Sequence, residues 1–252
     1  MTGNARSGYS TDWYPKKEEV IPRVYHEYLK NEDKNNIYTY EKLKEDDKAY
    51  YVNNPEDYKV NCYDGTKVKL IDTKIESILL LPGSKTKNTI ERRIFVKNIG
   101  KKDVYVRIHL AIPSCLDDAV VDPKYNFLHM NSSTFSLGQW IWSKNRNIPD
   151  GQFVASMSEY NYYTAKINGI DHNVYIITLD TVLKADTTSI RAFDRVYLDG
   201  KATDETVKKA NDILKTNKWE LPIVVESIAV GEYEYALDAF KAKFGEKVYN
   251  PF

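Results

Sequence analysis

Three aspartates that lie close together in the sequence are the residues best suited to bind a metal ion. Asp117 and Asp118 are adjacent, and Asp122 follows a short apolar interval. Carboxylate oxygens are the ligands that Ca²⁺ prefers in proteins, so these three are calcium candidates. A solvent-exposed acidic loop would have the same composition and needs no ion. We adopt this second interpretation and expect neither a resident metal ion nor a cofactor.

Glu226 is the acidic residue with the most unusual context, since it lies within the almost continuously apolar stretch 221–230. Burial there would raise the pKa of its carboxyl group, as it does in catalytic acids. A glycosidase requires two carboxylates, and this stretch supplies only one. We therefore expect Glu226 to lie at a sheet edge or on the surface, without a catalytic role.

The histidines do not form a recognisable catalytic motif. His26 and Glu27 begin the pattern of a zinc-protease helix, but Lys30 stands where the second histidine is required. His109 alternates with apolar residues, so we expect it to face solvent from a strand. Arg107 is expected to form a cross-strand salt bridge. The sequence therefore predicts a protein that is not an enzyme.

Trp140 and Trp142 would lie on one face of an extended segment, because side chains alternate along a strand. Two neighbouring indole rings could form a platform on which a sugar stacks. The alternative, which we favour, is that both rings belong to the core or to an interface.

The two cysteines, Cys62 and Cys115, are enough for one disulfide but not for a disulfide framework. Two unlinked buried thiols fit the sequence equally well. Both possibilities stay open at this point.

The charge balance argues against nucleic acid as a partner. Lys+Arg 36 is matched by Asp+Glu 36, whereas binding to phosphates depends on a positive surface. No apolar stretch reaches the roughly 18 residues needed to cross a bilayer. We therefore expect neither nucleic-acid binding nor a membrane span.

Residues 1–48 differ in composition from the rest of the chain. They are dense in charge and poor in branched aliphatics, and Pro15 and Pro22 interrupt any long helix. Such a segment cannot build a core alone, so we expect an extension that is partly helical or disordered until it docks. A β-domain would then span residues 49–252. The candidate docking anchors are Tyr9, Trp13, Tyr14, Val20 and Ile21.

The clearest structural signal is a pair of segments, residues 89–98 and 104–112. Every even position from Val104 to Ile112 is apolar, which is typical of a strand with one buried face. Asn98 and Gly100 tolerate the positive φ angles that a tight reversal demands. The pattern predicts two antiparallel strands.

Further segments extend this pattern. Residues 75–81 form an apolar stretch that Pro82-Gly83 is expected to end with a turn. The stretch 221–230 predicts a strand buried on both faces. Short helices are expected at residues 204–216, capped by Thr203, and at residues 232–244. Together these elements predict an all-β fold, a two-sheet antiparallel sandwich of jelly-roll or immunoglobulin-like type with two short helices.

Several segments between residues 49 and 244 resemble, in the same order, the camelysin/TasA-type exported proteins. Leu81-Pro-Gly83, Phe95-Val-Lys-Asn-Ile-Gly100 and Val104-Tyr-Val-Arg107 are similar to that family's proline-glycine, V-K-N-x-G and Y-V-R elements. The other similar segments are residues 49–53, 61–70, 161–163 and 223–240.

The resemblance implies a secreted β-sandwich that is exported through an alternate signal peptidase. Members of this family form biofilm-matrix fibres in which donated strands join the subunits. Their hydrophobic export signal would immediately precede position 49, where this chain has polar residues. From the resemblance we expect an extracellular or cell-surface location, although the export signal is not present in this chain.

These expectations combine into an extracellular structural protein, a fibre subunit whose main partner is another copy of itself. Cell-surface or matrix polysaccharide is a candidate second partner. The alternative is a carbohydrate- or surface-binding adhesion module that uses Trp140 and Trp142. A lesser alternative, a secreted metalloprotease, rests on the family label alone, because the sequence shows no metal-ligand set.

Overall fold

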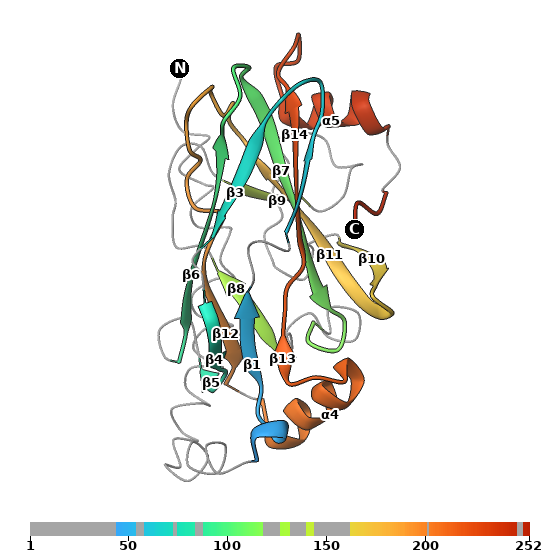
Figure 1. The fold of residues 1–252 in the computed structure, drawn as a ribbon. Coiled ribbons are helices and arrows are strands. Elements are labelled where there is room, and N and C mark those ends of the chain that lie inside the picture. Colours follow the sequence, from blue (N-terminus) through green and yellow to red (C-terminus); the bar gives the residue numbers. More distant parts are fainter. Residues whose placement is uncertain are drawn as a thin grey trace, which may run out of the picture.

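The computed structural model describes residues 44–53, 58–72, 75–83, 88–117, 127–131, 140–143, 162–200, 202–245 and 249–252 (Figure 1). The described chain is a β-sandwich with two α-helices, as the alternating patterns predict. In chain order its elements are η1 (Glu45–Asp47), β1 (Tyr50–Asn53), β2 (Lys59–Cys62), β3 (Val68–Asp72), β4 (Ile75–Leu79), β5 (Pro82–Gly83), β6 (Ile90–Asn98), β7 (Val104–Pro113), β8 (Leu128–Asn131), β9 (Trp140–Ser143), β10 (Tyr162–Ile167), β11 (Ile170–Leu179), β12 (Phe193–Asp199), α4 (Asp204–Leu214), β13 (Lys218–Trp219), β14 (Ile223–Ala229) and α5 (Ala236–Phe244).

Two sheets form the layers of the sandwich. The first, which we call the β7 sheet, has the strand order β10-β11-β7-β14-β2, and β9 also pairs with β11. The second, the β6 sheet, has the order β3-β6-β12-β5, and β8 also pairs with β12. A smaller sheet of β13, β1 and β4 lies at the end of the molecule where α4 packs (Figure 1).

Strands β6 and β7 form where the sequence predicts them, but they do not pair with each other. β6 pairs with β3 and β12, whereas β7 pairs with β11 and β14, so the connection at residues 99–103 carries the chain from one sheet into the other. The prediction of an antiparallel pair is therefore wrong. The apolar faces of both strands instead meet across the core, with Ile94 and Val96 on one side and Ile108 on the other.

Asn98 shapes this connection through its side chain rather than through a positive φ angle. Its amide nitrogen donates to the carbonyl oxygens of Lys102, at 2.8 Å, and Leu183, at 3.0 Å. Its amide oxygen accepts from the backbone N–H of Gly100, at 2.9 Å. Neither Asn98 nor Gly100 has a positive φ. A Cβ atom at Gly100 would approach the backbone nitrogen of Lys67 to 3.1 Å, so close packing explains the glycine.

Strand β7, at the centre of its sheet, is buried on both faces. Val106, Ile108 and Leu110 of β7 face the core between the two sheets. On the opposite face, Tyr105 packs with Phe240 of α5, and Ala111 packs with Phe252. β14 is likewise buried along almost its whole length, which confirms the predicted strand with two buried faces. It runs antiparallel to β7 and parallel to β2.

Both predicted helices are present, although each is shorter than its sequence pattern. The side chain of Thr203 caps α4 by accepting from the N–H of Thr206, at 3.3 Å. Pro82 and Gly83 do not form the expected turn but the two-residue strand β5, which pairs with β12. No helix in the described part of the chain is long and apolar enough to cross a membrane.

Residues 45–48, which the composition assigns to the N-terminal extension, are attached to the body. The amide nitrogen of Asn211 on α4 donates to the carbonyl oxygens of Asp46, at 3.1 Å, and Lys48, at 2.9 Å. Asn217 donates to the carbonyl oxygen of Glu45 at 2.6 Å. These bonds set the point from which residues 1–43 depart.

We predict that Asn98→Ala destabilises the fold by about 2–4 kcal/mol. The change removes the three hydrogen bonds of a fully buried side chain, at a cost of about 1 kcal/mol each. Urea unfolding monitored by tryptophan fluorescence measures the difference. Ile99→Thr, at a neighbouring exposed position, is the control and should change stability by no more than about 0.5 kcal/mol. Equal stability of the two variants would contradict the role given to Asn98.

Candidate functional site

Several residues named by the sequence lie outside the described residues. These are the docking anchors Tyr9, Trp13, Tyr14, Val20 and Ile21, the calcium candidates Asp118 and Asp122, and the isolated pair His26 and Glu27.

Asp117, the remaining calcium candidate, is buried rather than placed in a solvated loop. Its carboxylate accepts hydrogen bonds from the Tyr175 hydroxyl and from the amide nitrogen of Asn173, the latter at 3.2 Å. Its main-chain oxygen accepts from the same amide at 2.7 Å. Asp117 therefore attaches the end of the chain leaving β7 to β11. The described residues contain no group of three or more metal-ligating side chains.

Trp140 lies in the core, as the favoured interpretation of the two tryptophans expects, and not on a sugar-stacking platform. Its side chain is 5% exposed, and its indole N–H donates to the carbonyl oxygen of Ile190 at 2.9 Å. An aromatic ring held in this way offers no free face to a sugar. Trp142 pairs with Ile177 through the backbone of β9, and its side chain lies outside what the structure describes.

Cys62 and Cys115 are both free thiols, so the candidate disulfide is absent. Cys62 is exposed on β2, and its sulfur accepts from the N–H of Val68 at 3.4 Å. Cys115 is partly buried, and burial raises the pKa of its thiol to about 11.

The most concentrated group of ionisable side chains lies on the outer face of the β7 sheet. Glu226 of β14 stands directly opposite Arg107 of β7, and His109 is opposite the neighbouring Val224. Because side chains two residues apart share a face, all three charged or polar groups point to the same side of the sheet. All three are buried.

Each oxygen of the Glu226 carboxylate has two partners. Oε2 accepts from Nε of Arg107 at 2.6 Å and from Nε2 of His109 at 2.9 Å. Oε1 accepts from the hydroxyl of Tyr63 at 3.2 Å and from the hydroxyl of Tyr249. Since Nε2 of His109 donates to a carboxylate, Nδ1 of a neutral ring is left to accept from the hydroxyl of Tyr163, at 3.0 Å.

Burial and ion pairing act on Glu226 in opposite directions. Burial alone raises the pKa of a carboxyl group, but the hydrogen bond from His109 and the positive charge of Arg107 outweigh it, so the pKa of Glu226 lies below its ordinary value. Burial lowers the pKa of the Arg107 guanidinium, and Glu226 opposes that shift. Glu226 is therefore an ionised carboxylate and not the proton-bearing acid that its apolar surroundings suggest.

This cluster attaches two segments, α5 and residues 249–252, to the outer face of the β7 sheet. The guanidinium of Arg107 lies 4.3 Å from the ring centroid of Phe240 and 4.9 Å from that of Phe244, both on α5. It also donates to the hydroxyl of Tyr249 at 3.1 Å. The expectations that His109 faces solvent and that Glu226 lies at an edge or surface are wrong because α5 and residues 249–252 cover this face. The expected cross-strand salt bridge of Arg107 is confirmed.

A second buried ion pair lies between the sheets, at residues that the sequence pattern did not single out. Arg92 of β6 is fully buried and binds Oδ2 of Asp72, the last residue of β3, at 3.1 Å. Its Nη2 also donates to the hydroxyl of Tyr58 at 2.7 Å, and its guanidinium lies over the ring of Tyr51. The sequence did indicate that Arg92 is buried, because it lies at an even position on the apolar face of residues 90–98.

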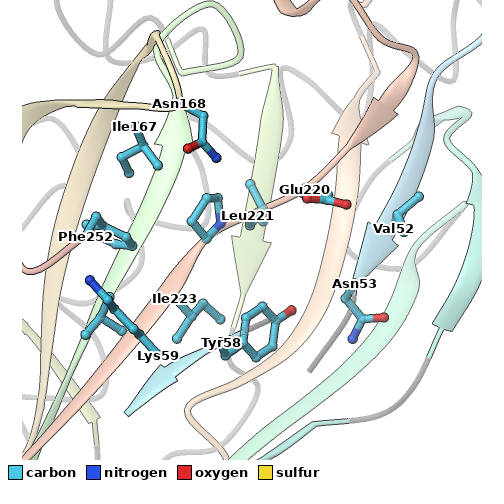
Figure 2. Close-up of a pocket in the computed structure, with 12 residues that line it drawn as sticks. Val52, Asn53, Tyr58, Lys59, Ile167, Asn168, Glu220, Leu221, Ile223 and Phe252 are labelled. Carbon is cyan, nitrogen blue, oxygen red and sulfur yellow. The ribbon is translucent and has the colours of Figure 1, made fainter. Parts of the chain in front are cut away.

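Tyr58 also lines a cavity of about 260 Å³ beside this ion pair (Figure 2). The cavity lies where β1 ends and β2 begins, next to the chain that enters β14 and the turn at Asn168. Its buried wall comes from Leu221 and Ile223, and the exposed Lys59 and Glu220 lie on opposite sides of the site in Figure 2. Among the described residues, the lining consists of Val52, Asn53, Tyr58, Lys59, Ile167, Asn168, Glu220, Leu221, Pro222, Ile223, Val224 and Phe252.

This cavity is the described site best suited to take up another molecule. The Glu226 cluster is sealed by protein, and each of its acceptors is already used. The cavity, by contrast, combines apolar walls with a few polar groups at its rim, the usual composition of a binding pocket. Sequence reasoning missed it because its lining comes from five separate parts of the chain.

Comparisons with known protein families, with curated proteins and with solved structures found no match for this chain.

We predict that Glu226→Gln destabilises the protein by about 3–5 kcal/mol at pH 7, because the variant leaves Arg107 as an uncompensated buried charge. Chemical unfolding measures this loss. Glu232→Gln, which removes an exposed carboxylate from the segment that follows β14, is the matched control and should leave stability almost unchanged.

The same pair of variants tests the ionisation state of Glu226. A folded pKa below the unfolded value of about 4.3 makes the ionised group stabilising above that pH. This contribution disappears as the pH falls through the folded pKa, so the Gln variant should lose less stability in acid than the parent. Parallel pH–stability curves for parent and variant would refute this assignment.

Thiol labelling should separate the two cysteines. At pH 7.5 we expect Cys62 to react rapidly with iodoacetamide, and Cys115 to react at least about tenfold more slowly, since the thiolate is the reactive form. Peptide mass spectrometry gives both rates, and unfolding in urea should make them similar. If neither residue reacts before a reductant is added, the two are linked.

Proposed function

We propose that the protein is an extracellular structural protein, a subunit of a cell-surface or biofilm-matrix fibre whose copies are joined by strand donation. The support has three parts: the ordered resemblance to exported fibre-forming proteins, the edges of the described sheets, and the long polar segment before the body. The observation on which the proposal depends most is the pattern of apolar side chains at the sheet edges.

Three terminal strands of the described sheets each expose an aliphatic side chain. Val60 on β2 is 37% exposed, Ile71 on β3 is 36% exposed, and Ile78 on β4 is 40% exposed. An edge strand offers unpaired N–H and C=O groups to an added strand, and proteins usually protect such edges with charge. Each of these strands also exposes a charged residue, but the exposed aliphatic on each strand favours association with another chain.

β2 is the edge best suited to receive a strand. It pairs with β14 only from Val224 to Ser227, and it is the last described strand of its sheet. Beyond that ladder, Leu221 and Ile223 line the cavity described above. A chain added along β2 would therefore gain main-chain hydrogen bonds from the edge and apolar contacts at the end of the ladder.

Residues 1–43 have the length required of a donor. They lead into Lys44, next to the 45–48 segment that α4 holds. A fully extended chain of this length spans roughly 140 Å, which exceeds the diameter of a single small domain. A donor of this kind reaches a neighbouring copy while its own body stays folded.

We predict that Val60→Lys suppresses filament formation, because a charged side chain on an edge strand discourages pairing. The parent protein should form filaments at high concentration under negative-stain electron microscopy, and the variant should need at least about tenfold more protein, a shift of about 1.4 kcal/mol. The control is Ile213→Lys, which places the same charge at another exposed aliphatic residue, on α4.

Deletion of residues 1–43 complements this test, with circular dichroism as the check that the β-structure is kept. The shortened chain should remain folded and monomeric. If the shortened protein forms filaments of normal length, residues 1–43 are not the donor. A parent protein that stays monomeric at every concentration would overturn the fibre proposal itself.

A further inference from the structure

We infer that the cavity at the β1–β2 junction is the receiving site for the side chain of Trp13 from another copy of the chain. The inference rests on the proposed fibre function and assigns the contact that would join two subunits. The side chain that would fill the cavity is therefore that of an aromatic residue, with one acidic and one basic residue nearby in the sequence.

The chemistry of the cavity favours an aromatic side chain over a polar ligand. Leu221 and Ile223 are buried within its wall, and Val52 and Pro222 are partly buried there. A cavity of about 260 Å³ accommodates one large ring system. A Trp side chain buries roughly 150–250 Å² and dominates the energetics of protein contacts. It also carries an N–H group, which can donate a hydrogen bond to the amide oxygen of Asn168 on the lining.

The protein already binds a similar peptide of its own beside this cavity. The ring of Phe252 forms part of the lining and packs with Ala111 and Ile167 on the outer face of the β7 sheet. The preceding carbonyl oxygen, that of Pro251, accepts a hydrogen bond from Nζ of Lys59 at 2.9 Å. An aromatic residue adjacent to proline is therefore a kind of segment that these walls accept.

The first 43 residues contain one segment of matching character, Asp12-Trp13-Tyr14-Pro15-Lys16. Trp13 lies next to a second aromatic residue and close to a proline. Asp12 and Lys16 carry opposite charges on either side of Trp13, and the rim of the cavity carries Lys59 and Glu220 on opposite sides (Figure 2). Pairing of Asp12 with Lys59 and of Lys16 with Glu220 would set the direction of the incoming chain, since charges at a rim contribute specificity.

The reach of the chain permits this contact between copies. Thirty residues separate Trp13 from Lys44, where the described chain begins, and they extend to roughly 100 Å at most. The same length would also reach the cavity of the same copy. The experiment must therefore distinguish contacts between copies from contacts within one copy.

Photo-crosslinking in the full-length protein makes that distinction. Trp13 is replaced by p-benzoylphenylalanine, and equal amounts of ¹⁴N- and ¹⁵N-labelled protein are mixed before assembly and irradiation. We expect cross-linked peptides that join position 13 to residues 220–224 or to Phe252, with one isotope on each side of the link. Links that carry only matched isotopes, or links that map to other surfaces, would overturn the inference.

Charge reversal provides a second, independent test. Lys59→Glu should raise the concentration needed for filaments about tenfold, and Asp12→Lys in the same chain should restore it. Asp12→Lys cannot replace the hydrogen bond from Lys59 to Pro251. Recovery of filament formation would therefore show that the loss came from the charge pair. Lys69→Glu, at an exposed lysine on β3, is the control and should not respond to Asp12→Lys.

The two proposals fail in different ways. Normal filaments together with a reversal that Asp12→Lys does not rescue would overturn the Trp13 contact and leave the fibre function intact. A parent protein without filaments, and without links between copies, would overturn both. Filaments that Trp13→Ala leaves unchanged would also exclude Trp13 as the anchor.

Discussion

The buried ion pair between Arg107 and Glu226 is the constraint on which the covered face of the β7 sheet depends. Both residues belong to central strands, so neither can turn its side chain to solvent without breaking the ladder that joins β7 and β14. Charges that remain in the interior need partners, because the cost of removing them from water is otherwise several kcal/mol. His109 and three tyrosines supply the remaining hydrogen bonds.

This requirement accounts for the parts of the chain that are not strands. α5 places two phenylalanine rings against the guanidinium of Arg107, and residues 249–252 bring the hydroxyl of Tyr249 to the carboxylate. The same short segment continues to Phe252, which forms one wall of the cavity. Neutralising a buried charge pair and shaping the cavity are therefore connected through a single segment. A substitution in the ion pair would therefore alter the shape of the cavity by shifting residues 249–252.

Much of the fold could be predicted from local patterns. The strands around residues 90–98 and 104–113, the doubly buried strand near residue 225 and both helices follow from alternation, helical spacing and the Thr203 cap. The predictions that failed concern what covers or pairs with an element. His109 and Glu226 were expected at the surface because a polar residue on one face of a strand usually indicates solvent. A helix and a terminal segment distant in sequence cover that face instead.

The sequence by itself determined the longer strands, such as β6, β7 and β14, because a periodic or continuous apolar pattern acts over a few neighbouring residues. Only the tertiary structure decided that β6 and β7 belong to different sheets, that Trp140 faces the core and that Cys62 and Cys115 stay apart. The physical reason is that pairing and burial depend on contacts between residues far apart in the chain. The cavity is the clearest example, since β1, β2, the β10–β11 turn, the start of β14 and Phe252 each supply part of its wall.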